Sequence, residues 1–154
     1  MIPRTQNITI LMADDDEDDR LMTKEALEEQ ARFKDHLRFV EDGEELLNYL
    51  RRRDKYQDPR TSPRLALILL DLNMPRMDGR QALREIKNDP RLRGIPVVIL
   101  TTSQAEEDIY RSYDLGVNSF IKKPVSFAAL SEVLKSLAHY WFDTVELPAD
   151  EEVV

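Results

Sequence analysis

Short apolar runs recur along the chain and are separated by longer polar or amphipathic stretches. Residues 65–70 (LALILL) and 96–100 (PVVIL) are almost wholly apolar, which is typical of strands buried on both faces of a parallel sheet. Residues 8–13 (ITILMA), 37–40 and 118–121 are three further short runs with strand character. The pattern therefore predicts five strands.

Helical patterns occupy the segments that follow these runs. The expected helices cover residues 18–33, 44–54, 81–88, 104–115 and 127–142, and a polar loop with two prolines covers residues 55–64. Strands that alternate with helices through short connections predict a doubly wound α/β fold with a five-stranded parallel sheet and five helices. We expect residues 1–154 to form a single domain, with a core at about 8–140 and a C-terminal extension at 141–154.

Composition narrows the class of protein. A chain of 154 residues with 42% hydrophobic and 34% charged residues suits one compact domain. The net charge of −8 argues against a nucleic-acid partner, and the absence of cysteine excludes disulfides and thiolate chemistry. No apolar run approaches the length of a membrane span or a signal peptide, so we expect no membrane partner and a cytoplasmic location.

Polar residues stand directly after four of the predicted strands. Asp14, Asp15 and Asp16 follow the first, Asp71 the third, Thr101 the fourth, and Lys122-Lys123-Pro124 the fifth. The carboxyl ends of parallel strands meet at one edge of the sheet, where ligands of such folds bind. Each residue alone has an ordinary role as a cap, turn or surface residue, but their joint position predicts one site.

The charges of these residues indicate the chemistry. Two carboxylates about 4 Å apart repel each other by roughly 4 kcal/mol at an effective dielectric constant of 20, so the cluster needs a counter-charge. Oxygen ligands without histidine or cysteine suit a hard cation such as Mg²⁺, or Mn²⁺. A metal, a lysine and a hydroxyl around a nucleophilic carboxylate are suited to phosphoryl transfer.

These residues resemble the receiver domain of two-component response regulators, across about residues 8–140. The motifs are Asp14-Asp15, LILLDLNMPRMDG around Asp71, VVILTTS around Thr101, and IKKP at Lys123-Pro124. The resemblance implies a flavodoxin-like sheet with strand order 2-1-3-4-5 and a phosphoacceptor switch instead of an enzyme. Such a switch takes its phosphoryl group from a histidine kinase and loses it by slow autodephosphorylation.

The resemblance also implies a role for each residue of the site. Asp71 is the expected phosphoacceptor, and Lys123 and Thr101 are expected to contact the phosphoryl group. Asp14, Asp15, Asp71 and the backbone carbonyl of Asn73 are the expected metal ligands. The family often has Glu-Asp in place of Asp14-Asp15, so the shorter Asp14 predicts a looser metal contact.

Two further residues take their expected roles from the same resemblance. Phe120 occupies the position of the family's switch aromatic, although plain core packing is an alternative. Pro124 is expected to follow a cis peptide that directs Lys123 inward.

A narrower resemblance connects the chain with single-domain regulators of phytochrome-type histidine kinases. It depends on the loop at residues 55–64 and on the C-terminal Tyr140-Trp141-Phe142 segment. It implies a phytochrome-like kinase as the partner. It also agrees with a homodimer through the C-terminal helix and tail, which the C-terminal residues favour, although an apolar helix face that only covers the sheet is an alternative. Tyr140, Phe142, Val145 and Leu147 are expected to form an exposed apolar patch in a monomer, because they lie off the predicted core face of the last helix or beyond its end.

Three other kinds of protein fit the residues less well. A phosphohydrolase would need an acid two residues after the nucleophile, where this chain has Asn73. An EF-hand-like loop starting at Asp14 would need glycine where Asp19 stands. A degenerate receiver used only for docking would lack one of the four motif residues, and none is missing.

Overall fold

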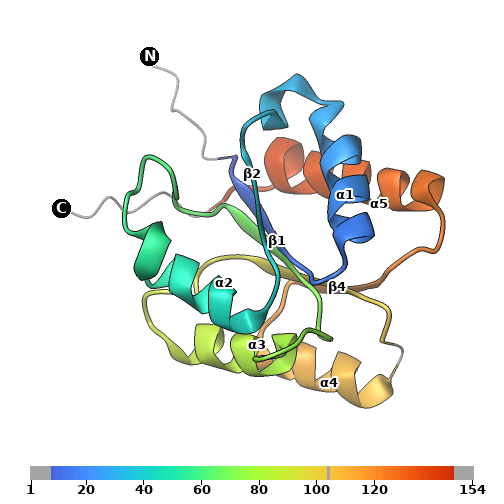
Figure 1. Cartoon of the computed structure of the whole chain (residues 1–154). Helices are drawn as coiled ribbons and strands as arrows, with labels where there is room; N and C mark the ends of the chain where they lie inside the picture. Colours follow the sequence, from blue (N-terminus) through green and yellow to red (C-terminus); the bar gives the residue numbers. More distant parts are fainter. Residues whose placement is uncertain (1–7, 104, 148–154) are drawn as a thin grey trace.

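The computed structural model describes residues 8–103 and 105–147. A central parallel sheet lies between two layers of helices (Figure 1). Its strand order is β2-β1-β3-β4-β5, which confirms the predicted order 2-1-3-4-5. The strands are β1 (Ile10–Ala13), β2 (Leu37–Val40), β3 (Leu67–Leu70), β4 (Val97–Thr101) and β5 (Ser119–Lys122).

Five α-helices cover the two faces of the sheet. They are α1 (Glu17–Glu28), α2 (Gly43–Leu50), α3 (Gly79–Asn88), α4 (Glu106–Leu115) and α5 (Phe127–His139). Helices α1 and α5 pack together on one face, while α2, α3 and α4 form a row on the other (Figure 1). Each face has its own apolar cluster, so β1, β3 and β4 are buried on both sides, as their apolar sequences predict.

The register of the strands brings their carboxyl ends into line. Ala13 pairs with Leu70, and Leu70 pairs with Ile99, so the residues that follow β1 and β3 leave the sheet side by side near the end of β4. The backbone amide of Asp71 donates to the carbonyl of Ala13 at 3.0 Å, which continues the β1–β3 pairing into the first loop residue. The sheet itself therefore fixes the relative positions of Asp14, Asp71 and Thr101.

Several boundaries differ from the predicted ones. Helix α1 stops at Glu28, and a separate 3₁₀ turn covers Ala31–Phe33. Helix α2 stops at Leu50, because the backbone of Arg52 is left-handed (φ 54°) and cannot continue a right-handed helix. The predicted start of α4 at Gln104 lies outside the described residues. Gly116 ends α4 as expected, with φ 102°.

The C-terminal segment folds back onto the domain. A π-helical turn, Tyr140–Thr144, follows α5 and places the Phe142 ring 5.3 Å from the Phe33 ring. Asp143 pairs with Arg32 beside it at 2.6 Å. The prediction of an exposed patch is therefore wrong for Phe142, which is 4% exposed, and for Val145 and Leu147, which pack half-buried against the same cluster. Tyr140 alone of the four is exposed.

The core face predicted for the last helix, Leu130, Val133, Leu134, Leu137 and Trp141, is confirmed in large part. Leu130 and Leu134 of α5 and Trp141 of the following turn are buried in the cluster, and Leu137 packs half-buried against it. Val133 is half-buried and lies outside the cluster. Residues 148–154 of the expected C-terminal extension lie outside the described residues. Among the described helices, none has the length and apolar character needed to cross a membrane.

Candidate phosphoacceptor site

Asp71 follows β3 and lies at the centre of the converging strand ends. Its side chain is nearly buried, and both carboxylate oxygens have partners. Oδ1 accepts a 2.7 Å hydrogen bond from the Thr101 hydroxyl and a 3.2 Å bond from the Asn73 amide. Oδ2 lies 3.2 Å from Nζ of Lys123. The expected partners of Asp71 are thus already in contact with it, including the hydroxyl of Thr101.

Lys123 is the positive centre of the site. Its Nζ lies 2.5 Å from Asp14, 2.7 Å from Asp19 and 3.2 Å from Asp71, and its side chain is 7% exposed. Burial alone would lower the pKa of Lys123, but hydrogen bonds to Asp14 and Asp19 outweigh burial and hold that pKa above its usual range. The lysine therefore remains charged and balances part of the acidic cluster.

The acidic residues that follow β1 have different roles. Asp14 is fully buried, and burial raises its pKa to about 6 in spite of Lys123. Asp15 is exposed at the mouth of the site. Asp16 caps α1 by accepting from the amides at positions 18 and 19. Asp19, on the first turn of α1, reaches back to Lys123, a contact that nothing in the sequence predicts beyond its place in the run.

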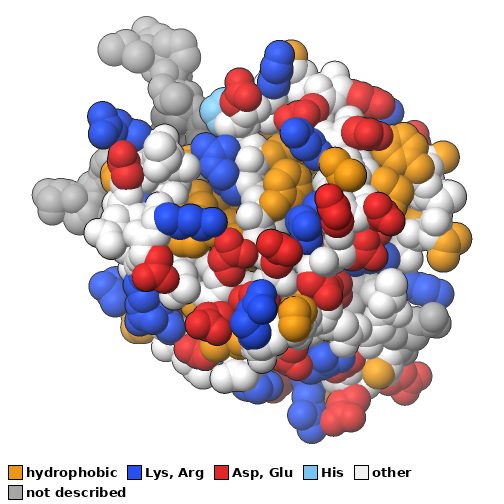
Figure 2. Space-filling view, in the orientation of Figure 1, with side chains coloured by type: hydrophobic (Ala, Val, Ile, Leu, Met, Phe, Trp, Pro, Cys, Tyr) orange, Lys and Arg blue, Asp and Glu red, His pale blue; other side chains and the backbone are white. Residues whose placement is uncertain are grey.

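The residues present fit a divalent cation. Asp14, Asp15 and Asp71 each offer a carboxylate oxygen, and these oxygens lie within 4.8 Å of one another. Figure 2 shows acidic side chains gathered around this end of the sheet. An all-oxygen donor set of three carboxylates suits a hard cation that retains several waters. A divalent-metal site is therefore consistent with the geometry.

The loop after Asp71 is held close to that residue by the Asp78-Gly79 pair at its end. Asp78 caps α3, because its carboxylate accepts a hydrogen bond from the backbone amide of Gln81 at 3.0 Å. Gly79 begins the helix against the backbone of Asp71, where a Cβ atom would lie 2.1 Å from the Asp71 carbonyl oxygen. Only glycine fits this close approach without moving the backbone that positions Asp71.

Arg80 connects this loop with α4. Its guanidinium makes two bonds to the Asp108 carboxylate, at 2.7 and 2.6 Å, and a 3.3 Å bond to Oδ1 of Asn73. Ser103 donates to the same carboxylate at 2.6 Å. The bonds from Arg80, supported by Ser103, lower the pKa of Asp108 to about 2. The sequence patterns did not predict this network, because its members lie far apart along the chain and Arg80 and Asp108, which form its centre, belong to no motif.

Two remaining predicted residues are less directly involved. Phe120 is half-buried, packs against the core and donates its amide to the Tyr113 hydroxyl at 3.2 Å, so both switch and core roles remain compatible with its position. The prediction of a cis peptide before Pro124 is wrong, since no described residue has a cis peptide. The trans form is the intrinsically favoured one, and the amide of Lys123 already bonds to the Thr101 carbonyl at 2.7 Å, which aligns the loop.

Known proteins share the sequence features of this site. The sequence model of one protein family, the response regulator receiver domain, matches residues 10–135 of the chain. The chain belongs to the response regulator receiver family.

Two curated relatives resemble the chain over most of their length. Response regulator Rcp1 of Synechocystis is 40% identical over 91% of this chain and 92% of its own. The probable methanogenesis regulatory protein FilR2 of Methanothrix harundinacea is 37% identical over 86% of this chain and 82% of its own.

Solved structures of response regulators also resemble the chain. The phosphorylated cyanobacterial phytochrome response regulator RcpA superimposes with a TM-score of 0.86 at 40% identity, covering 92% of this chain and 99% of RcpA. The Mn²⁺-bound form of Rcp1 gives 0.83 at 37% identity, covering 92% and 99%. The chain is therefore a two-component response regulator with a receiver domain similar to those of phytochrome regulators.

Proposed function

We propose that this protein accepts a phosphoryl group on Asp71 from a phytochrome-type histidine kinase, with Mg²⁺, and thereby switches a protein-interaction surface. The observation that carries the proposal is the arrangement around Asp71. A nearly buried carboxylate has a hydroxyl on one oxygen, a lysine near the other, and two more carboxylates beside it.

The chemistry of transfer follows from these contacts. An oxygen of Asp71 attacks the phosphorus of a phosphohistidine, the phosphorus–nitrogen bond breaks, and an acyl phosphate forms while the histidine nitrogen leaves with the bonding electrons. Lys123 and Thr101 contact different oxygens of the Asp71 carboxylate, so each can donate to the incoming phosphoryl oxygens. Asp14, Asp15 and Asp71, with the Asn73 carbonyl, would hold Mg²⁺, which supplies further charge neutralisation. Hydrolysis of the acyl phosphate by water resets the switch slowly.

The surface that responds lies near α4, β5 and α5. Thr101 ends β4, and Ser103 donates its amide to the Thr101 hydroxyl at 3.4 Å and its own hydroxyl to Asp108 on α4. Because Thr101 already contacts Asp71, phosphorylation need not draw it in from a distance. Instead, the hydroxyl exchanges a carboxylate oxygen for a phosphoryl oxygen, and the β4–α4 connection and Phe120 adjust.

The type of kinase is inferred from the relatives. RcpA is a phytochrome response regulator, and a similar structure, RPA3017, belongs to red-light signalling in R. palustris, at 36% identity and a TM-score of 0.81 over 93% of this chain and 99% of that chain. Likeness over nearly the whole length of these regulators supports a kinase of the same type. A cytoplasmic location goes with such a partner and stays a prediction.

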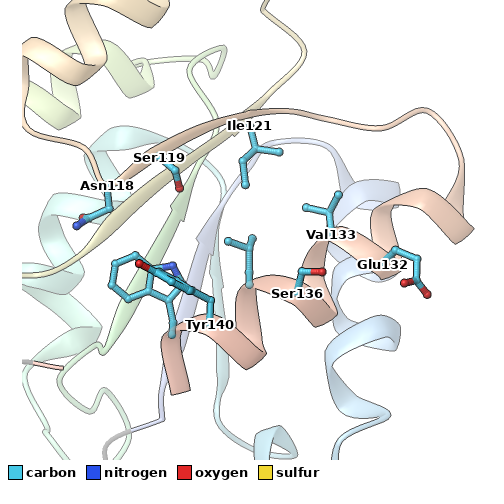
Figure 3. Close-up of a pocket in the computed structure, with 9 residues that line it drawn as sticks. Asn118, Ser119, Ile121, Glu132, Val133, Ser136 and Tyr140 are labelled. Atoms are coloured by element: carbon cyan, nitrogen blue, oxygen red, sulfur yellow. The ribbon is translucent and has the colours of Figure 1, made fainter. Parts of the chain in front are cut away.

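A homodimer through the C-terminal part is a further component of the proposal. Because Phe142 is buried and cannot belong to an exposed patch, the homodimer is inferred from another feature. This feature is a hollow of about 630 Å³ between β5 and α5, which a second copy of the chain could cover. Figure 3 shows Ile121 of β5 and Val133 of α5 on opposite sides of this hollow, with Tyr140 closing one end. Light scattering on the full chain and on its Tyr140→Glu variant at tens of micromolar tests the homodimer. A dimer whose interface covers the hollow should dissociate in the variant.

Phosphorylation is tested by mass spectrometry after treatment with a small phosphodonor and Mg²⁺. Wild type should gain one phosphoryl group, and Asp71→Asn should gain none. The matched control is Asp58→Asn, an aspartate in the loop before β3 that should label like wild type. Equal labelling of wild type and Asp71→Asn would contradict the assignment of Asp71 as the phosphoacceptor.

The kinase is tested separately, with purified phosphorylated kinases of several sensor types. Transfer from phytochrome-type kinases should be at least tenfold faster than from the others. Equal rates across the panel would contradict the inferred kinase type and leave the phosphoacceptor assignment intact.

A further inference from the structure

A second cavity lies at the opposite end of the sheet from Asp71. It has a volume of about 580 Å³ and opens between the carboxyl ends of α2 and α3 and the segment that leads into β3. Of the residues that the structure describes, Arg51, Arg52, Arg64 and Arg91 line it, and Asp89 contributes the one carboxylate. Leu65 lies in this wall and Asp71 six residues further along, so the cavity and the acceptor are about 20 Å apart along β3.

The residues that line this cavity carry more positive than negative charge, in a chain whose net charge is −8. Each helix carboxyl end carries about half a negative elementary charge, so α2 and α3 together balance about one guanidinium. Asp89 lies 3.9 Å from both Arg51 and Arg91, which is a long distance for an ion pair, and Glu85 of α3 pairs with Arg51 at 3.2 Å. The charge of Arg51 is therefore balanced, whereas that of Arg91 is balanced only in part. Figure 2 shows basic side chains gathered on this side of the molecule, over the end of α2 and the loop after it.

Two of the arginines are held in place by neighbours. Arg51 bonds to Glu85 of α3 at 3.2 Å, and Arg52 donates to the carbonyl of the buried Ser62 at 2.8 Å. Both contacts cross from one segment to another and limit the rotamers of these side chains. A guanidinium that is already oriented loses less conformational entropy when it binds an anion.

The floor of the cavity is apolar. It is made by the buried side chains of Tyr49, Leu65 and Leu92, and the Tyr49 hydroxyl is bonded to the Pro63 carbonyl at 2.6 Å. The burial of Tyr49 raises its pKa to about 12, so the ring remains neutral. A cavity of this volume, with an apolar floor and charged side chains on its walls, is large enough for a small organic ligand.

We propose that this cavity binds a small phosphate-bearing ligand, of the size of a nucleoside diphosphate, with its phosphates on the arginines and its organic part on the apolar floor. A guanidinium group can donate two parallel hydrogen bonds to the oxygens of one phosphate. Several guanidiniums together therefore suit a ligand with more than one phosphate better than a ligand with a single carboxylate. The site is separate from the acceptor and gives the receiver a second input.

Calorimetric titration of the full chain tests the proposal with three probes: ADP, inorganic pyrophosphate and adenosine. The titration uses the Asp71→Asn background without Mg²⁺, so the acceptor site cannot contribute and the result does not depend on the proposed phosphotransfer. We expect one ADP or pyrophosphate per chain and at least tenfold weaker binding of adenosine. ADP that binds tighter than pyrophosphate identifies a nucleotide, whereas pyrophosphate of equal or higher affinity identifies a free polyphosphate, and both results support the proposal.

Variants locate the binding. Arg91→Gln removes a side chain that is 89% exposed, so it should fold normally and weaken ADP binding at least fivefold. Arg52→Gln should do the same, and Asp89→Asn should strengthen binding a few-fold while keeping the oxygen that accepts from the Arg91 amide. Arg111→Gln on α4 is the control and should bind like the parent. Absence of binding for both phosphate probes, adenosine binding as tight as ADP, or equal binding by the arginine variants and the control would overturn the proposal.

Discussion

Among residues 8–103 and 105–147, three carboxylates surround one lysine at the carboxyl end of the sheet, whereas four guanidiniums and one carboxylate line a cavity at the amino end. The first cluster is buried: Asp14, Asp71 and Lys123 are each at most 8% exposed. The second is open, since Arg52 and Arg91 are exposed and two further arginines are half-buried.

This difference in burial separates the two ends energetically. Buried charges lose their hydration and are tolerated only when partners replace it, so the removal of one partner is costly. Exposed charges keep most of their hydration, and their removal changes stability little. The carboxyl end should therefore be sensitive in both stability and chemistry, and the amino end should be sensitive in binding alone.

The largest expected effect is that of Lys123→Met. It leaves the buried Asp14 and its neighbours without their cation and should lower the free energy of unfolding by about 3–5 kcal/mol in urea without Mg²⁺. Arg91→Met at the other end should lie within about 0.5 kcal/mol of wild type. Similar losses for the two variants would contradict the distinction between the ends.

Gly79→Ala should have the next largest effect. The added Cβ would lie 2.1 Å from the Asp71 carbonyl oxygen, so the loop must shift, at a cost of about 1–3 kcal/mol and with slower labelling of Asp71. Gly94→Ala is the matched control, because a Cβ there meets no atom within 4 Å. Thermal unfolding and the rate of phosphodonor labelling measure both consequences, and equal behaviour of the two variants would refute the importance of this close approach.

Mg²⁺ should act on the carboxyl end alone. At ten times its dissociation constant, the cation should raise the free energy of unfolding by about 1.4 kcal/mol. Asp15→Asn should remove most of that gain, and Asp18→Asn, an exposed aspartate on the first turn of α1, should retain it. A melting temperature that is unaffected by millimolar Mg²⁺ would count against the metal site.

The smallest expected effect concerns the link between Arg80 and Asp108. Because Arg80 lowers the pKa of Asp108 from 3.8 to about 2, the ionised carboxylate stabilises the folded state above about pH 4. That contribution, about 1 kcal/mol after allowance for solvent screening, should be lost as the pH falls from about 4 through 2. Asp108→Asn should therefore be less stable than wild type at pH 7, and urea unfolding should show the difference narrowing at pH 3.

A control on α4 makes this result specific. Glu107→Gln breaks the exposed pair with Arg111 and should cost at most about 0.5 kcal/mol. A difference between Asp108→Asn and wild type that is the same at pH 7 and pH 3 would show that the Asp108 pKa is not lowered in the folded state.

Sequence patterns predicted much of the fold because the signals are local. The apolar runs of β3 and β4 and the glycine after α4 each act within a few residues. The patterns failed where a distant contact decides: the π-helical turn at Tyr140 depends on Phe33 and Arg32, more than 100 residues earlier in the chain. Likewise, Asp19 and Asp18 look alike in the acidic run, and only the approach of Lys123 to α1 distinguishes them.

Local patterns were enough to predict the succession of strands and helices along the chain. They also placed the acids, the threonine and the lysine at the strand ends, because periodicity and motif spacing are properties of neighbouring residues. Three features needed the packed structure: which acids share Lys123, how Arg80 joins the acceptor loop to α4, and that four arginines line one cavity. They depend on side chains from separate segments, whose positions are set by the packing of helices on the sheet and by the cost of burying charge.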